Sequence, residues 1–480
     1  MESHITSVRI NINKFLLFYC VVIAVVYWAI FSPGILAVDS VHQYRQAVTG
    51  EYTDWHPVIM ALLLAVILKT GGDLSLLIFL QILLGFVGIF RLTVLVNQLC
   101  RMPKLTAHLT SGFILLFFSL PITPFVIYLS TFWKDTWLLI LMIWFVVLLL
   151  DVSAERHPAA TRRLVIKTLA LMAVASLILL VRHNTIVMFP VMMFAVWWIY
   201  RSKDLKWYAI PVVILAPLLI YFSFNTFQYS ILKTARTHIE HIVYEIDLVS
   251  MIAYNPSLLD VLPYTAAHLK GDLRRDFEIG DSAYADLYLN ELIDQSSYLA
   301  ADNHDLLVDE YKYAVLHFPL TWLSVKAIMF LSLIDPSRER YAFHDHMQKN
   351  EFGISFNSFF SSERQFIFAI GKRVMAHPVA RWFSYTHLPW FLLDIVMMAG
   401  GILLHFRKPA PGRNYAVFIS MLSIPLVYYF SFFLAVTAPD FRFMYPSTLI
   451  VQLIFLIILS HGVGNFLSAG VGRSERRIVQ

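Results

Sequence analysis

Long apolar runs separated by short polar segments fill the first half of this chain and return at its end. A helix needs about 20 apolar residues to cross a bilayer, so we expect these runs to be membrane-spanning helices. The predicted spans are residues 15–32, 74–97, 107–124, 137–150, 165–181, 185–200, 208–224, 388–406, 414–436 and 443–462. The run 137–150 is too short to cross alone and must extend into its flanks. The pattern predicts an all-α integral membrane protein with about ten transmembrane helices.

Two shorter apolar runs, 57–69 and 320–334, have lengths typical of interfacial or re-entrant helices. We place both on the extracytoplasmic side without a crossing. If only one of them crossed the membrane, every later loop would change sides, and the basic loops would no longer share one side. Length and charge together therefore exclude them from the predicted spans.

Composition agrees with a membrane location. Hydrophobic residues make up 58% of the chain and charged residues 14%, whereas soluble domains carry about 25% charged residues. The two cysteines, Cys20 and Cys100, lie in or beside predicted spans, so they provide neither a disulfide framework nor a metal-ligand cluster. These features exclude a soluble enzyme and a disulfide-rich secreted domain.

Basic residues are concentrated in alternate loops. Seventeen lysines and arginines, against five acidic residues, lie in the N-terminus, 98–106, 151–164 together with Lys167, 201–207, 407–413 and the C-terminal tail. The positive-inside rule places these segments and both termini in the cytoplasm. We therefore predict a multi-pass membrane protein whose basic loops face the cytoplasm. Its net charge of +5 reflects topology, and we expect the lipid bilayer rather than nucleic acid as its partner.

The spans divide the chain into three parts. Residues 1–224 form an N-terminal transmembrane module whose first outer loop is 33–73. Residues 225–387 form a long extracytoplasmic region, and residues 388–480 form a C-terminal transmembrane module with a basic cytoplasmic tail. The long region contains helix-compatible segments and little strand alternation, so we expect it to be mainly helical, with an interfacial helix near 320–334.

Asp39 lies in the first outer loop, a few residues beyond the first span. A carboxylate at this place can take the proton of a hydroxyl at the membrane surface, and burial can raise its pKa toward that task. His42 and Gln43 follow closely and can orient the base or bind sugar hydroxyls. The alternative is that Asp39 caps a surface helix, with His42 and Gln43 as ordinary surface residues.

The first outer loop also contains Asp54-Trp55-His56-Pro57, directly before the short apolar run. Pro57 suits the first position of a helix, and Asp54 or His56 can cap that helix. This is the structural interpretation of the segment. The functional interpretation places His56 beside a bound substrate.

Lys134 and Asp135 follow Trp133 between the third and fourth predicted spans. Because charges inside hydrocarbon are costly, we expect both to face the extracytoplasmic side. Lys134 can stabilise negative charge on a bound group, and Asp135 can accept hydrogen bonds from it. The alternative is a lysine–aspartate pair that anchors the helix end.

Two further polar turns occur at predicted outer ends of spans. Arg182-His183 separates two apolar runs, and the guanidinium of Arg182 suits bidentate binding of a phosphate. Its alternative role is a helix-turn anchor. Asp440, Arg442 and Tyr445 lie between the last two spans. Asp440 and Arg442 either belong to a site or simply pair with each other.

These segments together resemble a known enzyme family. The resemblance is carried by Pro33-Gly34, Asp39-Ser40, Gln43, Trp55-His56-Pro57 and Trp133-Lys134-Asp135. Their order is similar to the outer loops of bacterial GT-C glycosyltransferases, polytopic enzymes that include relatives of phage serotype-converting proteins. The resemblance covers the topology of the whole chain, but specific similarity is confined to four short loops. It implies inverting transfer of a hexose or pentose from a polyprenyl-phosphate donor to a lipid-linked or cell-surface glycan.

The resemblance also implies a role for each candidate residue in an extracytoplasmic active site. Catalytic roles fall to Asp39, as general base, and to Asp135. Contacts to the donor phosphate fall to Lys134, Arg182, His183 and Arg442. Contacts to the substrate fall to His42, Gln43, His56, Asp440 and Tyr445.

No cofactor follows from the sequence. The pair Asp39-Ser40, in place of paired acids, weakens the case for an obligatory metal, although a divalent cation is compatible with the loop. His238 and His241 have i, i+3 spacing, but no third ligand follows at a recognisable spacing, so we assign no metal ligands. Walker, G-x-G-x-x-G and HExxH motifs do not occur.

Two other function classes share parts of this pattern. An O-antigen-type polymerase or ligase has a similar topology, but it uses a lipid-diphosphate donor and depends on arginines in large outer loops. A non-enzymatic lipid or glycan transporter should show broken helices and polar residues near mid-span. The polar groups of this chain cluster at the outer ends of spans instead, which favours a surface-facing enzyme.

Overall fold

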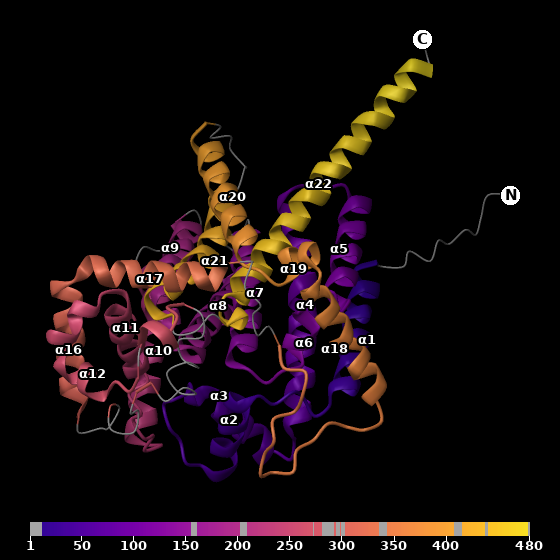
Figure 1. Cartoon of the computed structure of the whole chain (residues 1–480). Helices are drawn as coiled ribbons and strands as arrows, with labels where there is room; N and C mark the ends of the chain where they lie inside the picture. Colours follow the sequence, from indigo (N-terminus) through magenta and orange to yellow (C-terminus); the bar gives the residue numbers. More distant parts are fainter. Residues whose placement is uncertain are drawn as a thin grey trace.

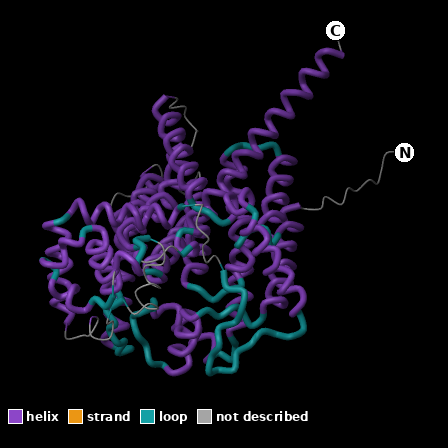
Figure 2. Tube along the Cα trace, viewed as in Figure 1, coloured by secondary structure: helices purple, strands orange, loops and turns teal. Residues whose placement is uncertain are grey.

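The protein is almost entirely helical. The computed structural model describes residues 12–154, 161–201, 209–271, 273–280, 292–293, 298, 303–335, 343–407, 415–436 and 440–478. Helices account for 80% of it, and strand pairing in the part described is limited to isolated bridges such as Ile35–Thr131 and Thr53–Ala235 (Figure 2). The all-α prediction is confirmed.

Nine segments of the described chain are long and apolar enough to cross a membrane. They are α1 (Ile12–Phe31), α4 (Leu74–Leu99), α7 (Lys134–Ala154), α8 (Thr161–Val181), η1 with α9 (His183–Met188 and Phe189–Arg201), α10 (Ala209–Ser230), α20 (Leu388–Arg407), α21 (Tyr415–Ala435) and α22 (Tyr445–Ile478). Each overlaps one predicted span. By the length and composition of its helices, the chain is a multi-pass membrane protein.

The third predicted span, 107–124, corresponds to a shorter helix. Helix α5 (Lys104–Ser119) has 16 residues, fewer than the roughly 20 of a full crossing. It ends because Pro121 restricts the residue before it, and Leu120 has an extended backbone. The short helix α6 (Phe125–Leu129) follows. Counting α5 as the tenth crossing remains a prediction.

The other two short apolar runs also form short helices. The run 57–69 is helix α3 (Val58–Lys69). The run 320–334 lies in α17 (Pro319–Ile334), which meets α16 (His304–His317) at a bend of 100°. Pro319 occupies the first turn of α17 and cannot continue the hydrogen bonding of α16. In Figure 1, α17 lies across the upper end of α16.

The two ends of the helical bundle differ. Helices α2 (Val38–Thr49) and α3 pack against each other at one end, whereas the C-terminal ends of α20 and α22 extend from the opposite end (Figure 1). Between them, α4 packs against α1, α5, α7 and α22. Gly88 allows this close packing, since a Cβ there would lie 2.9 Å from Cγ2 of Ile143 on α7.

The described part of the long region 225–387 is helical as well. It contains α11 (Glu240–Tyr254), η2 (Pro256–Asp260), α12 (Pro263–His268), α13 (Leu273–Asp276), α16, α17, α18 (Ser361–Ala376) and α19 (Pro378–Ser384). Helix α11 packs against α16 and α17, and α17 in turn contacts α21. A buried ion pair joins Asp247 of α11 to Lys326 of α17 at 2.6 Å. The region therefore has a core of its own and is attached to the membrane helices.

Candidate active site

Backbone pairing brings the first outer loop beside the start of α7. The amide of Ile35 donates to the carbonyl of Ser130 at 2.8 Å, and the amide of Phe132 donates to the carbonyl of Ile35 at 3.0 Å. Helix α2 then begins at Val38, and Asp39 lies in its first turn. A negative charge is favoured there because the helix N-terminus carries free amide groups. Loops from two separate parts of the chain are thus held side by side.

Asp39 is paired with a residue from the far end of the chain. Nη1 of Arg442 donates to Oδ2 of Asp39 at 2.9 Å. Nε of the same guanidinium lies 2.7 Å from Oδ2 of Asp440. Asp440 also accepts from the amide of Arg442 and so caps the short helix η4 (Phe441–Phe443). The loop before α22 therefore presents Arg442 between two carboxylates.

His56 connects Asp39 to Lys134. Nζ of Lys134 lies 3.3 Å from Nδ1 of His56, and Nε2 of His56 lies 4.0 Å from Oδ1 of Asp39. An ammonium group only donates, so we assign the ring proton of His56 to Nε2, which faces Asp39. Burial, together with the charge of Lys134, lowers the pKa of His56 to about 3. The imidazole is neutral at physiological pH.

A second ion pair lies deeper in the structure. Arg182, in the turn between α8 and η1, contacts the carboxylate of Asp135 in the first turn of α7. The guanidinium of Arg182 lies over the rings of Phe432 and Phe443, and its Nε donates to Asn184 at 3.0 Å. The side chain of Asp135 is 1% exposed. Arg182 is thus fixed by charge, hydrogen bonding and stacking.

The described residues at this end form what we call the charged cluster: Asp39, His56, Lys134, Asp135, Arg182, Asp440 and Arg442. With His56 neutral, three cations face three carboxylates. Burial opposes ionisation of Asp39, but the charges of Arg442 and Lys134 and the Arg442 hydrogen bond hold the pKa of Asp39 well below its usual range. Burial raises the pKa of Asp440 instead. Asp39 is the more readily ionised of these two acids.

The remaining predicted site residues lie around this cluster with different exposure. His42 and Gln43 follow Asp39 by three and four residues, so they share its face of α2. His42 is exposed, whereas both amide atoms of Gln43 are buried without a hydrogen-bond partner among the described residues. His183 is exposed at the start of η1. Tyr445 is buried, with its ring centroid 4.6 Å from that of Tyr128.

Asp54 and His56 do not cap α3 as the sequence suggested. The helix begins after Pro57, and no side chain caps it. Asp54 instead accepts hydrogen bonds from the hydroxyl of Tyr229 at 2.9 Å and from the amide and hydroxyl of Thr237 at 2.6 and 2.7 Å. Asp54 therefore ties the first outer loop to the segment that precedes α11.

Sequence reasoning missed His344. Its ring centroid lies 5.4 Å from that of Trp133, and burial together with the charge of Arg442 lowers the pKa of His344 to about 4. The segment that carries it is held to the first outer loop by a hydrogen bond from the amide of Gln348 to the carbonyl of Leu36. The run of titratable residues His344-Asp345-His346 was the available signal.

The charged cluster contains three groups that can take part in catalysis: the accessible carboxylate of Asp39, the neutral imidazole of His56 and the ammonium group of Lys134. The side chain of Asp39 is 25% exposed. In the described part of the chain, Lys134 contacts His56 and has no carboxylate within 4.0 Å. Proton abstraction beside an anion site is therefore possible in geometric terms. Comparison with protein-family models, curated proteins and solved structures finds no match to this chain.

Proposed function

We propose that this protein is a membrane glycosyltransferase. It transfers a sugar from a polyprenyl-phosphate donor to a cell-surface or lipid-linked glycan, on the extracytoplasmic side of a bacterial inner membrane. The observation that carries the proposal is the charged cluster itself. A half-buried carboxylate, Asp39, lies one imidazole away from Lys134, a cation with no carboxylate partner among the described residues.

Asp39 acts as the general base. As the acceptor hydroxyl oxygen bonds to the anomeric carbon, its proton passes to the Asp39 carboxylate, and the bond from the anomeric carbon to the phosphate oxygen breaks. Exposure supports this choice over Asp135. The side chain of Asp39 is 25% exposed, whereas that of Asp135 is 1% exposed and paired with Arg182.

Lys134 binds the phosphate that leaves. The leaving phosphate gains negative charge as the glycosidic bond breaks, so a nearby cation stabilises the transition state more than the ground state. Arg182 and Arg442 already have carboxylate partners in the resting site. Lys134 therefore makes the first contact to the donor, ahead of Arg182.

Donor binding also raises the pKa of Asp39, the proposed base. The charge of Arg442 holds the pKa of Asp39 low, although burial opposes this. A low pKa makes a carboxylate a weak base. A phosphate that attracts Arg442 weakens its bond to Asp39 and raises the pKa of Asp39. The base gains strength when the donor is in place.

The test is a transfer assay with the full-length protein in lipid nanodiscs. Polyprenyl-phosphate hexoses and pentoses serve as donors, and mass spectrometry detects the glycosylated acceptor glycan extracted from a strain that lacks the gene. The Asp39→Asn variant should lose roughly 100- to 10,000-fold in rate, the usual contribution of a general base. The matched control is Glu51→Gln, an exposed acid of the same loop, which should transfer normally.

Two results would contradict the proposal. One is near-normal transfer by a folded Asp39→Asn variant. The other is transfer by the wild-type protein from lipid-diphosphate donors only, which would assign it to the polymerase class.

A further inference from the structure

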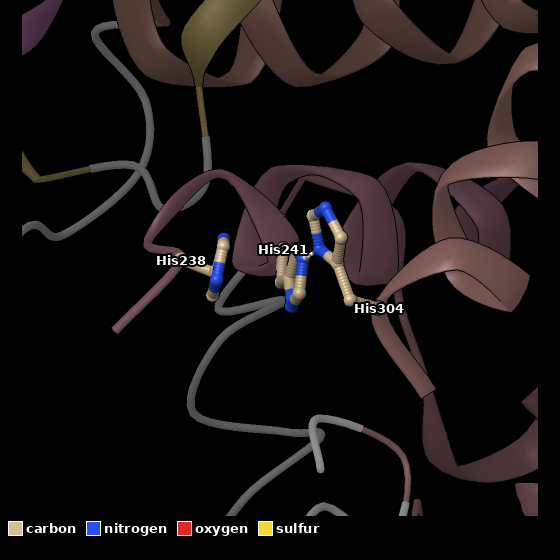
Figure 3. A group of neighbouring side chains, drawn as sticks. All are labelled: His238, His241 and His304. Carbon is tan, nitrogen blue, oxygen red and sulfur yellow. Dashed lines mark hydrogen bonds between the residues drawn. The ribbon is translucent and has the colours of Figure 1, made fainter. Parts of the chain in front are cut away.

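Three histidines converge outside the charged cluster. One ring nitrogen from each of His238, His241 and His304 lies within 4.8 Å of the other two (Figure 3). Nε2 of His241 contacts Nδ1 of His304. His241 is buried, and the other two side chains are half-buried. This is the one such group of potential metal ligands in the described part of the chain.

The three side chains come from two helices that are distant in sequence. His238 and His241 belong to the first turn of α11 and the residues before it, and the amide of His241 donates to the carbonyl of His238 at 2.9 Å. His304 is the first residue of α16, which packs against α11. The i, i+3 pair thus acquires the third imidazole that local spacing did not reveal. No metal ligands were assigned from the sequence because His304 lies 63 residues beyond His241.

We propose that His238, His241 and His304 bind a divalent transition metal of the zinc type. Zinc–nitrogen bonds are about 2.0–2.1 Å long, so two imidazole nitrogens on one tetrahedral ion lie about 3.3 Å apart. The three nitrogens lie within 4.8 Å of one another, and the stacked rings turn on binding so that each nitrogen faces the ion. Imidazole nitrogen suits zinc, copper and nickel, whereas calcium and magnesium require oxygen ligands.

The carboxylate of Glu240 contacts the ring of His238 and can fix its orientation. Oε1 of Glu240 lies 3.2 Å from Nδ1 of His238, which leaves Nε2 of that ring for the metal. Carboxylates commonly fix the orientation of metal-binding imidazoles in this way. Three protein ligands leave a fourth position of a tetrahedral ion for water.

The site is linked to the first outer loop. Thr237, next to His238, donates from its amide and its hydroxyl to Asp54. Backbone bonds also join Asp54 to Ala235 at 3.1 Å and Ala235 to Tyr52 at 2.9 Å. A metal that fixes His238 to His304 therefore also stabilises the segment that leads to His56. Metal binding itself does not depend on the proposed reaction.

The experiment measures zinc binding by the full-length protein, purified in detergent without a polyhistidine tag and treated with a chelator. After addition of Zn²⁺ and removal of the excess, the wild-type protein should retain one equivalent of zinc. Its X-ray absorption should report nitrogen ligands at about 2.0–2.1 Å. Zn²⁺ should raise the thermal unfolding midpoint in a concentration-dependent manner, since a ligand of the native state stabilises it. Ca²⁺ and Mg²⁺ should not.

The variant and its control lie on the same helix. His304→Gln removes a ligand at the start of α16 and should abolish both zinc retention and the rise in the unfolding midpoint. His317→Gln changes an exposed histidine at the end of α16 and should leave both intact. Unchanged zinc retention in His304→Gln, or no retention by the wild-type protein, would overturn the proposal.

Hydrogen exchange tests the link to the first outer loop in the same samples. Zn²⁺ should slow exchange of the amides of Asp54 and Ala235 in the wild-type protein but not in His304→Gln. If Zn²⁺ binds without slowing the exchange of these two amides, the metal site does not stabilise the first outer loop.

Discussion

Arg442 donates a hydrogen bond of 2.9 Å to the carboxylate of Asp39, although 403 residues separate them in the chain. The contact joins the first outer loop to the loop before the last helix. It also determines the resting state of the proposed base, because the charge of Arg442 lowers the pKa of Asp39 against the effect of burial. The pair can therefore be tested through the pH dependence of the reaction.

The first prediction concerns that pH dependence. Asp39 must be ionised to accept a proton, so the transfer rate falls as the pH drops through its pKa. Replacing Arg442 with Gln removes the charge that lowers this pKa, so the acid limb of the profile should move to higher pH. The measurement is kcat/KM against pH for both proteins. Asp440→Asn is the control, since it leaves Arg442 beside Asp39, and its acid limb should not move upward.

A second prediction separates donor binding from structure. Lys134→Ala should raise the donor concentration needed for half-maximal transfer, with a small change in stability, because Lys134 has no carboxylate partner among the described residues. Arg182→Ala leaves Asp135 buried and unpaired, which typically costs about 3–5 kcal/mol. We therefore expect a lower unfolding midpoint for Arg182→Ala.

Arg182→Lys completes this comparison. It keeps the charge but loses the planar fork, so it should recover only part of the stability. Titration of the polyprenyl-phosphate sugar and thermal unfolding on the same samples distinguish the two roles. An unaltered donor curve for both Lys134→Ala and Arg182→Ala would end the assignment of a phosphate site to these residues.

Features that depend on residues close together in the sequence were predictable, whereas contacts between distant residues were not. Hydrophobic runs are local, so nine long helices were predicted at approximately the right places. Helix α5 ends earlier than the predicted span 107–124 because Pro121 stops it. This signal is local, but the prediction followed the apolar run and did not use it. Several candidate residues singled out by position, such as Asp39, His56 and Lys134, lie close together in the structure.

Their partners were not predictable in the same way. Asp440 and Arg442 pair as one alternative expected, but Arg442 also bonds Asp39, and Arg182 pairs with Asp135. These contacts depend on helix packing between distant parts of the chain. The same holds for His304, which lies 63 residues beyond His241. Local spacing carries no information about such pairs.

A third prediction tests the core of the long region. Asp247 and Lys326 form a 2.6 Å ion pair in which both side chains are completely buried. Lys326→Met leaves the carboxylate unpaired and should destabilise the protein by about 3–5 kcal/mol, seen as a lower unfolding midpoint. Lys312→Met breaks an exposed pair, with side chains 65% and 78% exposed, and should cost about 0–1 kcal/mol.

A compensating change should restore most of this loss. Asp247→Asn removes the unpaired charge, and its amide oxygen can still accept from Tyr311 and Trp322, which donate to Asp247 at 3.0 and 3.1 Å. The double variant Asp247→Asn/Lys326→Met should therefore be more stable than Lys326→Met alone. The opposite order would show that the charge pair does not determine the stability of this region.

The last prediction tests the orientation of the protein in the membrane, on which every proposed role depends. The positive-inside rule puts Lys104, the first residue of α5, in the cytoplasm, and Ser257, in η2, outside. Both side chains are exposed, so a cysteine at either position is open to a thiol reagent. The background protein should carry Cys100→Ser, because that native thiol is half-buried, whereas Cys20 is buried. In intact spheroplasts, an impermeant maleimide should label Ser257→Cys at once and Lys104→Cys only after the membrane is permeabilised. The reverse pattern would put Asp39 and the charged cluster on the cytoplasmic side, where a sugar presented on the outer leaflet cannot reach them.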